Sequence, residues 1–224
     1  MIVAIDGPAG AGKSSASRLL AARLGLALVD TGALYRCVAL AARDQGVAWD
    51  DDARLAGLVP TLALSFGWRG GEPRVYLGGR DVTAAIRDPE ISRGASTASA
   101  RRSVRDGLFD LQRRLGREAP GGAVLEGRDI GTVVFPDADA KFFLTADPRV
   151  RAGRRLAELV GRGVATTLAA VLTEQEQRDH DDENRAVAPL RRAPDAEPID
   201  TTALSLDEVV ATMERSLRRR GLIP

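Results

Sequence analysis

Residues 7–14 have the types and the spacing of a phosphate-binding loop. Gly7, Gly12, Lys13 and Ser14 fill every fixed position of the pattern G-x-x-x-x-G-K-[ST]. Glycines let successive backbone N–H groups point into one concavity, the lysine adds a positive charge between the outer phosphates, and the serine hydroxyl can ligate Mg²⁺. The motif therefore predicts that the chain binds a nucleoside triphosphate. The predicted binding residues are Gly7, Pro8, Ala9, Gly10, Ala11, Gly12, Lys13, Ser14 and Ser15.

The segments on either side of this motif have the patterns that a phosphate-binding loop requires. Residues 2–5 are apolar and predict a buried strand, while Ala16, Leu19, Leu20 and Leu24 recur at helical spacing and predict a helix over 17–24. A strand, a glycine-rich loop and a helix is the context in which the motif binds phosphate. The alternative, a glycine-rich surface turn, does not explain these two flanks.

Further charged groups follow other predicted strands. Strands are expected at 26–29, 123–125, 141–144 and 199–200. Thr31 is the expected N-cap of a helix that carries Tyr35 and Arg36 near its start, and residues 126–129 follow the strand at 123–125. Ligands of open α/β sheets bind at the carboxyl ends of the strands, which makes these groups candidates for a site. The plainer alternative makes Arg36 a solvated helix charge and Tyr35 a core residue.

The remaining pattern predicts the fold class, an α/β domain with a parallel five-stranded sheet flanked by helices. Alternating residues at 62–82, with turns at 70–71 and 78–79, predict a small inserted antiparallel meander. Asp88 and Asp147, each followed by proline, predict helix starts. Helices are expected at 88–99, 103–117, from 148, at 168–176 and after a capping box of Ser205 and Glu208. The charge-dense run 177–185 is expected to be a solvated helix face.

Composition narrows the class of function. The chain of 224 residues has 32 basic and 31 acidic residues, a net charge of +1, and one cysteine and one histidine. The balanced charge gives no reason to expect a nucleic-acid or membrane partner. A single cysteine excludes an intrachain disulfide and fits a cytoplasmic location, and any metal should be hard and oxygen-ligated. A monomer is expected, because no large apolar helix face is left unassigned.

Four stretches of the sequence resemble the bacterial cytidylate kinases, within the nucleoside monophosphate kinase family. They are residues 7–15, 30–36, 126–137 and 178–190, and the matches run in the same order from residue 2 to about 202. Many nucleotide-binding proteins share the first stretch, whereas the third and fourth are far more specific. The meander also resembles the extra small sheet of the bacterial members. One departure is that residues 180–183 are more acidic than the resemblance leads us to expect.

The resemblance implies a role for each matching residue. Arg36 and Arg128 would hold the acceptor phosphate with bidentate hydrogen bonds, and Asp129 would accept from the N4 amine of cytosine. The whole implied CMP-binding set is Thr31, Tyr35, Arg36, Ser96, Arg105, Arg128, Asp129, Arg178, Asp182 and Arg185. The arginines that could neutralise the transferring phosphoryl group are Arg151, Arg154, Arg155 and Arg162. The expected catalytic set is Lys13, Arg128, Arg154 and Arg155.

The reaction that the resemblance implies is phosphoryl transfer from ATP to CMP, with dCMP as a second acceptor. Mg²⁺ would be held by Ser14, phosphates and waters, and Asp6 is considered only for a water-mediated contact. An acceptor phosphate with a second pKa of about 6 is largely dianionic at neutral pH, so no strong general base is needed. The single domain would comprise a core (1–36, 118–149 and 186–224), a monophosphate-binding region (37–117) and a lid (150–185).

Three alternatives to this activity stay open at the sequence level. Another small-molecule kinase, with UMP, AMP or shikimate as the acceptor, would share the loop and the scaffold. A regulatory GTPase would need an N-K-x-D motif, which the sequence lacks. A nucleotide-binding module without catalytic activity would not need arginines at several strand ends.

Overall fold

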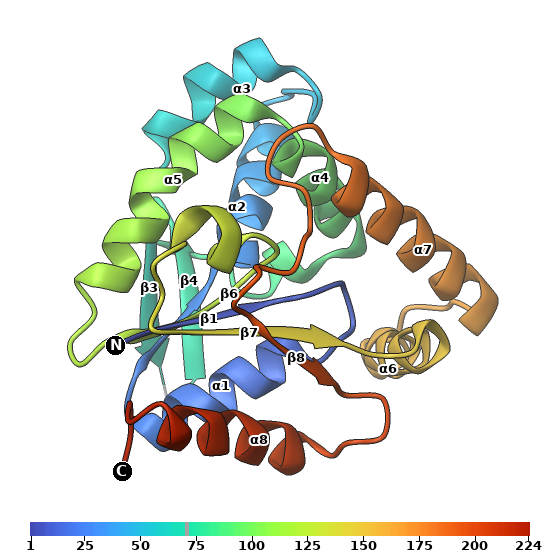
Figure 1. Cartoon of the computed structure of the whole chain (residues 1–224). Helices are drawn as coiled ribbons and strands as arrows, with labels where there is room; N and C mark the ends of the chain where they lie inside the picture. Colours follow the sequence, from blue (N-terminus) through green and yellow to red (C-terminus); the bar gives the residue numbers. More distant parts are fainter. Residues whose placement is uncertain (70–71) are drawn as a thin grey trace. The chain divides into compact units, whose positions relative to one another are not determined.

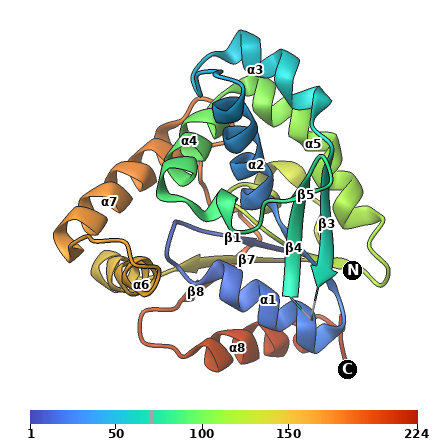
Figure 2. The same cartoon turned by 180° about the vertical axis from the view of Figure 1, so that it is seen from behind.

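The computed structural model describes residues 1–69 and 72–224. These residues form two compact units (Figures 1 and 2). The first unit consists of Met1–Val29 and Arg113–Pro224, and the second consists of Asp30–Gln112. Each unit is described by itself below. The division into core, monophosphate-binding region and lid stays a prediction.

The first unit is built on a five-stranded sheet, as predicted. Its strand order is β2-β6-β1-β7-β8. The strands are β1 (Ile2–Asp6), β2 (Ala27–Asp30), β6 (Ala123–Glu126), β7 (Ala140–Thr145) and β8 (Glu197–Asp200). β1 runs parallel to both β6 and β7, and β7 runs parallel to β8. The carboxyl ends of β1 and β6 therefore lie side by side, with Ile5 paired to Glu126.

Alternating side chains of β1 bury both faces of this sheet. Val3 and Ile5 belong to a core cluster with α1 (Lys13–Leu24) and α8 (Leu206–Arg219), two helices that run along the same face (Figure 1). Ala4 points to the other face, where Leu125 and Phe135 are buried with it. This alternation is the period-2 pattern of a strand that is covered on both sides.

Two helices, α6 (Pro148–Gly161) and α7 (Leu168–Asn184), pack against each other as a hairpin. They share a small core of their own around Ala152, Leu159 and Val171. α6 begins as predicted, because the Asp147 carboxylate accepts hydrogen bonds from the N–H groups of the first turn and Pro148 follows it. α7 continues through the charge-dense run without interruption.

The second unit contains helices and the predicted meander. Its helices are α2 (Thr31–Asp44), α3 (Asp52–Leu58), α4 (Pro89–Ser99) and the first part of α5 (Arg102–Arg117). The strands β3 (Leu64–Arg69), β4 (Glu72–Leu77) and β5 (Arg80–Asp81) pair antiparallel in that order. Gly78 and Gly79 form the predicted two-residue turn, and their φ angles of 58° and 79° explain why glycine occupies both positions. The turn predicted at 70–71 lies outside the described residues.

Some local predictions were wrong or incomplete. Asp30, and not Thr31, is the N-cap of α2, since its Oδ1 accepts a hydrogen bond from the N–H of Ala33 at 2.9 Å. α1 begins at Lys13, four residues earlier than predicted. The helix α3 and a π-helical turn at Ile130–Val134 were not predicted. The capping box of Ser205 and Glu208 is confirmed at the start of α8.

Candidate active site

The loop between β1 and α1 has the backbone of a phosphate-binding loop. Gly7, Gly10 and Gly12 adopt positive φ angles of 145°, 76° and 85°. A Cβ atom at Gly7 would lie 2.0 Å from the carbonyl oxygen of Leu144 in β7, so only glycine lets the loop pass that close to the sheet. The loop ends at the N-terminus of α1, where backbone N–H groups and the helix dipole favour an anion.

Lys13 is buried at the start of α1, with 6% of its surface exposed. Its ammonium group donates to the carbonyl oxygen of Pro8, with an Nζ–O distance of 2.7 Å. Burial lowers the pKa of Lys13 well below its usual value, and the charges of Arg128 and Arg178 lower it further. A bound polyphosphate would oppose this effect, because its negative charge favours the protonated amine.

Ser14 connects this loop to the neighbouring strand. Its hydroxyl group donates to the Glu126 carboxylate at the end of β6, with an Oγ–Oε2 distance of 2.7 Å. Glu126 is buried, with 4% of its surface exposed. Glu126 belongs to the candidate group 126–129, but the sequence assigned it no role of its own. A hydroxyl and a carboxylate are the hard oxygen donors that Mg²⁺ prefers.

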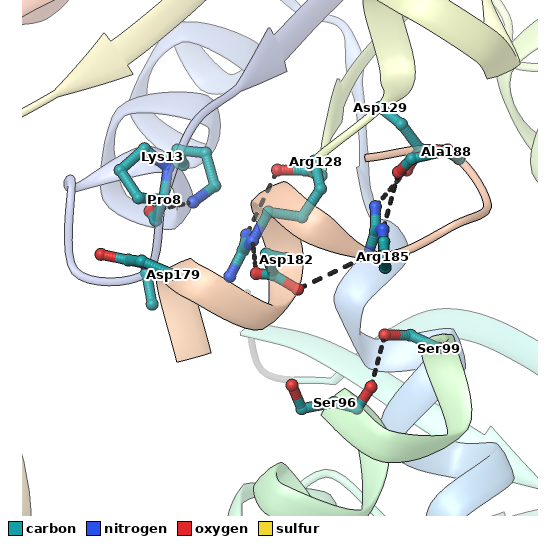
Figure 3. A network of polar contacts seen from close by, with 12 residues as sticks. Pro8, Lys13, Ser96, Ser99, Arg128, Asp129, Asp179, Asp182, Arg185 and Ala188 are labelled. Carbon is teal, nitrogen blue, oxygen red and sulfur yellow. Dashed lines mark hydrogen bonds and ion pairs between the residues drawn. The ribbon is translucent and has the colours of Figure 1, made fainter. Parts of the chain in front are cut away.

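Four of the five predicted acceptor ligands of the first unit, Arg128, Asp129, Asp182 and Arg185, form one polar network (Figure 3). The Arg128 guanidinium donates from Nε to Oδ2 of Asp182 at 2.8 Å. Arg185 lies 3.5 Å from the other oxygen of Asp182 and 3.7 Å from Oδ1 of Asp129, and its Nε donates to the carbonyl oxygen of Ala188. Segments that are far apart in sequence thus meet beyond the end of β6.

Burial and charge oppose each other at the centre of this network. Burial by itself would raise the pKa of Asp182, but Arg128, Arg178 and Arg185 outweigh it and hold that pKa below its usual range. Asp182 is therefore ionised at neutral pH. Only 5% of its surface is exposed, which corrects the prediction that the whole run 177–185 is a solvated helix face.

The four arginines considered for charge neutralisation have different partners. Arg151 is buried, pairs with Asp179 at 2.6 Å and donates to the carbonyl oxygen of Ala9 in the phosphate-binding loop at 3.0 Å. Arg154 donates to Oγ1 and to the carbonyl oxygen of Thr201, at 3.0 and 2.7 Å. Arg155 and Arg162 both pair with Glu158, at 2.8 and 3.6 Å. Arg151 is thus a loop-supporting residue in this structure.

Two residues that contact the loop, and one that acts through Arg151, were not selected from the sequence. The Thr201 hydroxyl, which follows β8, donates to the carbonyl oxygen of Ala11 at 3.1 Å. Gln175 of α7 lies against the loop, with its Nε2 2.9 Å from the position of a Cβ at Gly10. Asp179 orients Arg151. The contacts of Thr201 and Gln175 with the loop join residues more than 140 positions apart, and Asp179 lies on a different helix from Arg151, so local sequence patterns do not reveal them.

Two of the predicted acceptor ligands of the second unit, Tyr35 and Arg105, contact each other, and others contact neighbouring residues. Arg36 pairs with the helix-capping Asp30 at 2.7 Å. The guanidinium of Arg105 lies over the ring of Tyr35, 5.4 Å from its centroid, and its Nε donates to the carbonyl oxygen of Ser99. The Ser99 hydroxyl donates in turn to the carbonyl oxygen of Ser96 at 2.9 Å. Thr31 is buried in the first turn of α2.

These residues can bind and neutralise phosphate groups. The first unit presents a phosphate-binding loop, a buried lysine and an oriented guanidinium, and the ends of two neighbouring parallel strands bring them together. Oriented cations and backbone N–H groups can stabilise the charge of a transferring phosphoryl group. Among the described residues, no helix is both long and apolar enough to span a membrane.

Comparison with known proteins identifies close relatives of this chain. The family model described as cytidylate kinase matches residues 3–219. The cytidylate kinase of Geobacter sulfurreducens is 53% identical over 220 residues, which cover 98% of this chain and 94% of the relative. The cytidylate kinase of Geobacter sp. (strain M21) is 52% identical with the same coverage.

A solved structure supports the fold alone. The crystal structure of an uncharacterized protein from Eubacterium ventriosum superposes with a TM-score of 0.53. It covers 97% of this chain and 98% of its own length, at 12% sequence identity. The similarity shows a shared arrangement of strands and helices.

Proposed function

This chain belongs to the cytidylate kinase family, an enzyme family that phosphorylates nucleoside monophosphates, and from that premise we propose that it transfers the γ-phosphoryl group of ATP to CMP. dCMP is the proposed second acceptor. The observation that carries the proposal is the junction of β1 and β6. There the Ser14 hydroxyl contacts Glu126, and the Arg128–Asp182 pair follows two residues later. A donor site and an acceptor site can thus be built within one unit.

Mg²⁺ is the proposed metal, and the donor chemistry at Ser14 fits it. The Ser14 hydroxyl would ligate the ion, and Glu126 would orient that hydroxyl or hold a water ligand. Mg²⁺ supplies charge that neutralises the β- and γ-phosphate oxygens of the nucleotide. Protein ligands in such sites are few, because Mg²⁺ usually keeps several waters.

The proposed mechanism is positioning together with charge neutralisation. Lys13 would bind the outer phosphates of ATP. Arg128, which Asp182 orients, would hold the phosphate of CMP, and an oxygen of that phosphate would be the nucleophile. That phosphate is largely dianionic at neutral pH, so its oxygen can attack without a general base. Arg154 and Arg155 are the proposed cations for the transferred group, after release from Thr201 and Glu158.

Asp129 is the proposed base-reading residue. An ionised carboxylate only accepts hydrogen bonds, so it suits the N4 amine of cytosine and repels the O4 oxygen of uracil. Asp129 is 4% exposed and Arg185 lies beside it. A buried site of this kind leaves a polar group unpaired when the wrong base enters. In the second unit, the acceptor contacts of Thr31, Tyr35, Arg36, Ser96 and Arg105 stay predictions.

An acceptor panel tests the proposed activity directly. Purified protein is incubated with ATP and Mg²⁺ and with CMP, dCMP, UMP, AMP or shikimate, and ADP production is measured. We expect ADP to form with CMP and dCMP, and at a much lower rate with the other acceptors. A preference for UMP, AMP or shikimate would identify a different small-molecule kinase. ADP formation that does not depend on an acceptor would indicate a nucleotide hydrolase.

The helical hairpin of α6 and α7 is the proposed lid, over residues 150–185. Its own small core allows it to move as one body, and the arginines considered for charge neutralisation lie on α6 and in the turn after it. We expect amide hydrogen exchange in this hairpin to slow when ATP and CMP analogues bind together. α8 serves as the internal reference, with unchanged exchange. Equal exchange of the hairpin with and without both ligands would contradict a closing lid.

The cellular setting is also a proposal. The near-neutral net charge of +1 and the single cysteine support a cytoplasmic monomer that works on small nucleotides, without a nucleic-acid or membrane partner. Light scattering of the purified protein, with and without nucleotides, would measure the oligomeric state.

A further inference from the structure

Asp6, the last residue of β1, connects the start of the phosphate-binding loop to the segment that carries Arg128 and Asp129. Its side chain is buried, with 5% of the residue surface exposed. Oδ1 accepts a hydrogen bond from the N–H of Ile130 at 2.9 Å, and Oδ2 accepts one from the N–H of Gly131 at 2.7 Å. Both carboxylate oxygens therefore bind adjacent backbone amides 124 and 125 residues away.

These amides begin the π-helical turn Ile130–Val134, which follows Asp129 directly. The first N–H groups of a helical turn have no partner within the turn and need an external acceptor. Asp129 is the N-cap residue of this turn, but its side chain makes no capping hydrogen bond. Asp6 accepts the hydrogen bonds of those N–H groups instead. The turn is therefore capped by a residue of β1 and not by the residue at its N-cap position.

The fit between Asp6 and this turn is close. A Cβ atom at Gly131 would touch Oδ2 of Asp6 at 3.4 Å and would lie 3.1 Å from Cδ of Lys141, so a larger residue requires the turn or the lysine side chain to shift by a few tenths of an ångström. Lys141 holds the far end of the same segment, since its ammonium donates to the carbonyl oxygen of Pro136 at 2.6 Å. The backbone after Asp129 is thus fixed to the sheet at two points.

We propose that Asp6 is a positioning residue for acceptor recognition: by capping the turn at Ile130, it fixes the backbone from which Arg128 and Asp129 project. This inference rests on the proposed roles of those two residues. It assigns Asp6 to the acceptor side of the reaction, although Asp6 immediately precedes the loop for ATP. The contacts that Asp6 makes in the structure are with these two backbone amides, one for each carboxylate oxygen.

Electrostatics agree with this geometry. Burial raises the pKa of Asp6 to about 6, while the two backbone hydrogen bonds and the charge of Lys13 act in the opposite direction and Asp129 adds to the rise. Burial of a carboxylate is unfavourable unless its oxygens accept hydrogen bonds. Here two backbone N–H groups each need an acceptor, and the two oxygens of a carboxylate supply both.

Asp6→Asn tests the proposal, because an asparagine of nearly the same shape has one acceptor oxygen and places an NH₂ donor against the second N–H. We expect the ratio of kcat/KM for CMP to that for UMP to fall by ~10-fold or more, with a higher KM for CMP, since one misplaced hydrogen-bonding group at a base-reading site has an effect of this size. The KM for ATP should change by less than ~3-fold, because the loop backbone keeps its own contacts.

Asp139→Asn is the matched control. Asp139 also accepts a backbone N–H of β1, from Ile2 at 2.6 Å, but at the opposite end of the strand. If Asp6 had only a stabilising role, the two variants would both lower the melting temperature and leave the CMP to UMP ratio unchanged. That result would overturn the proposal.

Gly131→Ala is the second test, and it decides the matter if Asp6→Asn does not fold. The added methyl group would be crowded between Cδ of Lys141 at 3.1 Å and Oδ2 of Asp6 at 3.4 Å, so it disturbs the contact of the turn with Asp6 without changing any charge. The same fall in the ratio is expected, and an unchanged ratio with an unchanged KM for CMP contradicts the proposal.

Asp129→Ala separates the positioning role of Asp6 from the base reading proposed for Asp129. If Asp129→Ala abolishes the discrimination and both Asp6→Asn and Gly131→Ala preserve it, only the positioning role fails; if wild-type protein uses UMP as well as CMP, the proposed base reading fails.

Discussion

Lys13→Ala is expected to reduce turnover by ~100-fold or more while the protein stays folded, because removal of one preorganised charge from a phosphoryl-transfer site has an effect of at least this size. Lys13 is buried at the start of α1, and its ammonium donates a hydrogen bond to the carbonyl oxygen of Pro8. The substitution removes that contact and the charge that is proposed to bind the outer phosphates. Steady-state ADP production and circular dichroism measure the two parts of the prediction.

Arg23→Ala is the control for Lys13→Ala. Arg23 is also a cation on α1, but it pairs with Asp207 and Glu214 of α8, away from the loop. It should keep nearly normal turnover. If Lys13→Ala were as active as Arg23→Ala, Lys13 would have no part in the mechanism.

Wild-type protein is expected to use CMP at least ~100-fold better than UMP in kcat/KM, and Asp129→Ala is expected to shrink this ratio chiefly by harming CMP. The reason is the acceptor-only chemistry of an ionised carboxylate in a buried position. The measurement is the pair of kcat/KM values for the two acceptors at saturating ATP.

The competing explanation is that Asp129 only orients Arg128. The structure gives that role to Asp182, whose Oδ2 accepts from Nε of Arg128, and it places Arg185 beside Asp129. An orienting role would lower activity with both acceptors and leave their ratio unchanged. Asp137→Ala, a change at an exposed aspartate of the same segment, should affect neither value.

The elements around the loop could be predicted from sequence, because their signals are local. The glycine spacing at 7–12 requires positive φ angles in the loop, and the structure has them at Gly7, Gly10 and Gly12. Proline after aspartate marked the starts of α4 and α6, and two adjacent glycines marked the hairpin turn between β4 and β5. Each of these features depends on residues that are neighbours in the chain.

Several positions in the site were decided by tertiary contacts. The charge-dense run at 177–185 has the local pattern of a solvated helix face, yet Asp182 is buried because Arg128, 54 residues away, supplies the compensating charge. Glu126 was a candidate only as part of the group 126–129 and received no role, because its partner, the Ser14 hydroxyl, is 112 residues away. Burial of a charged group becomes favourable only when its partner is in place, and no local pattern contains that information.

The phosphate-binding loop, the α/β class and the family could be predicted from residue types at fixed spacings along the chain. The tertiary structure decided which oxygen atoms each cation meets and which carboxylate supports which segment. Asp6 shows the difference most clearly: its type and its place before the loop suggested a link to the metal, whereas its contacts lie with the amides of Ile130 and Gly131. Parallel strands bring those amides to it, since β1 and β6 are neighbours in the sheet although about 120 residues separate them.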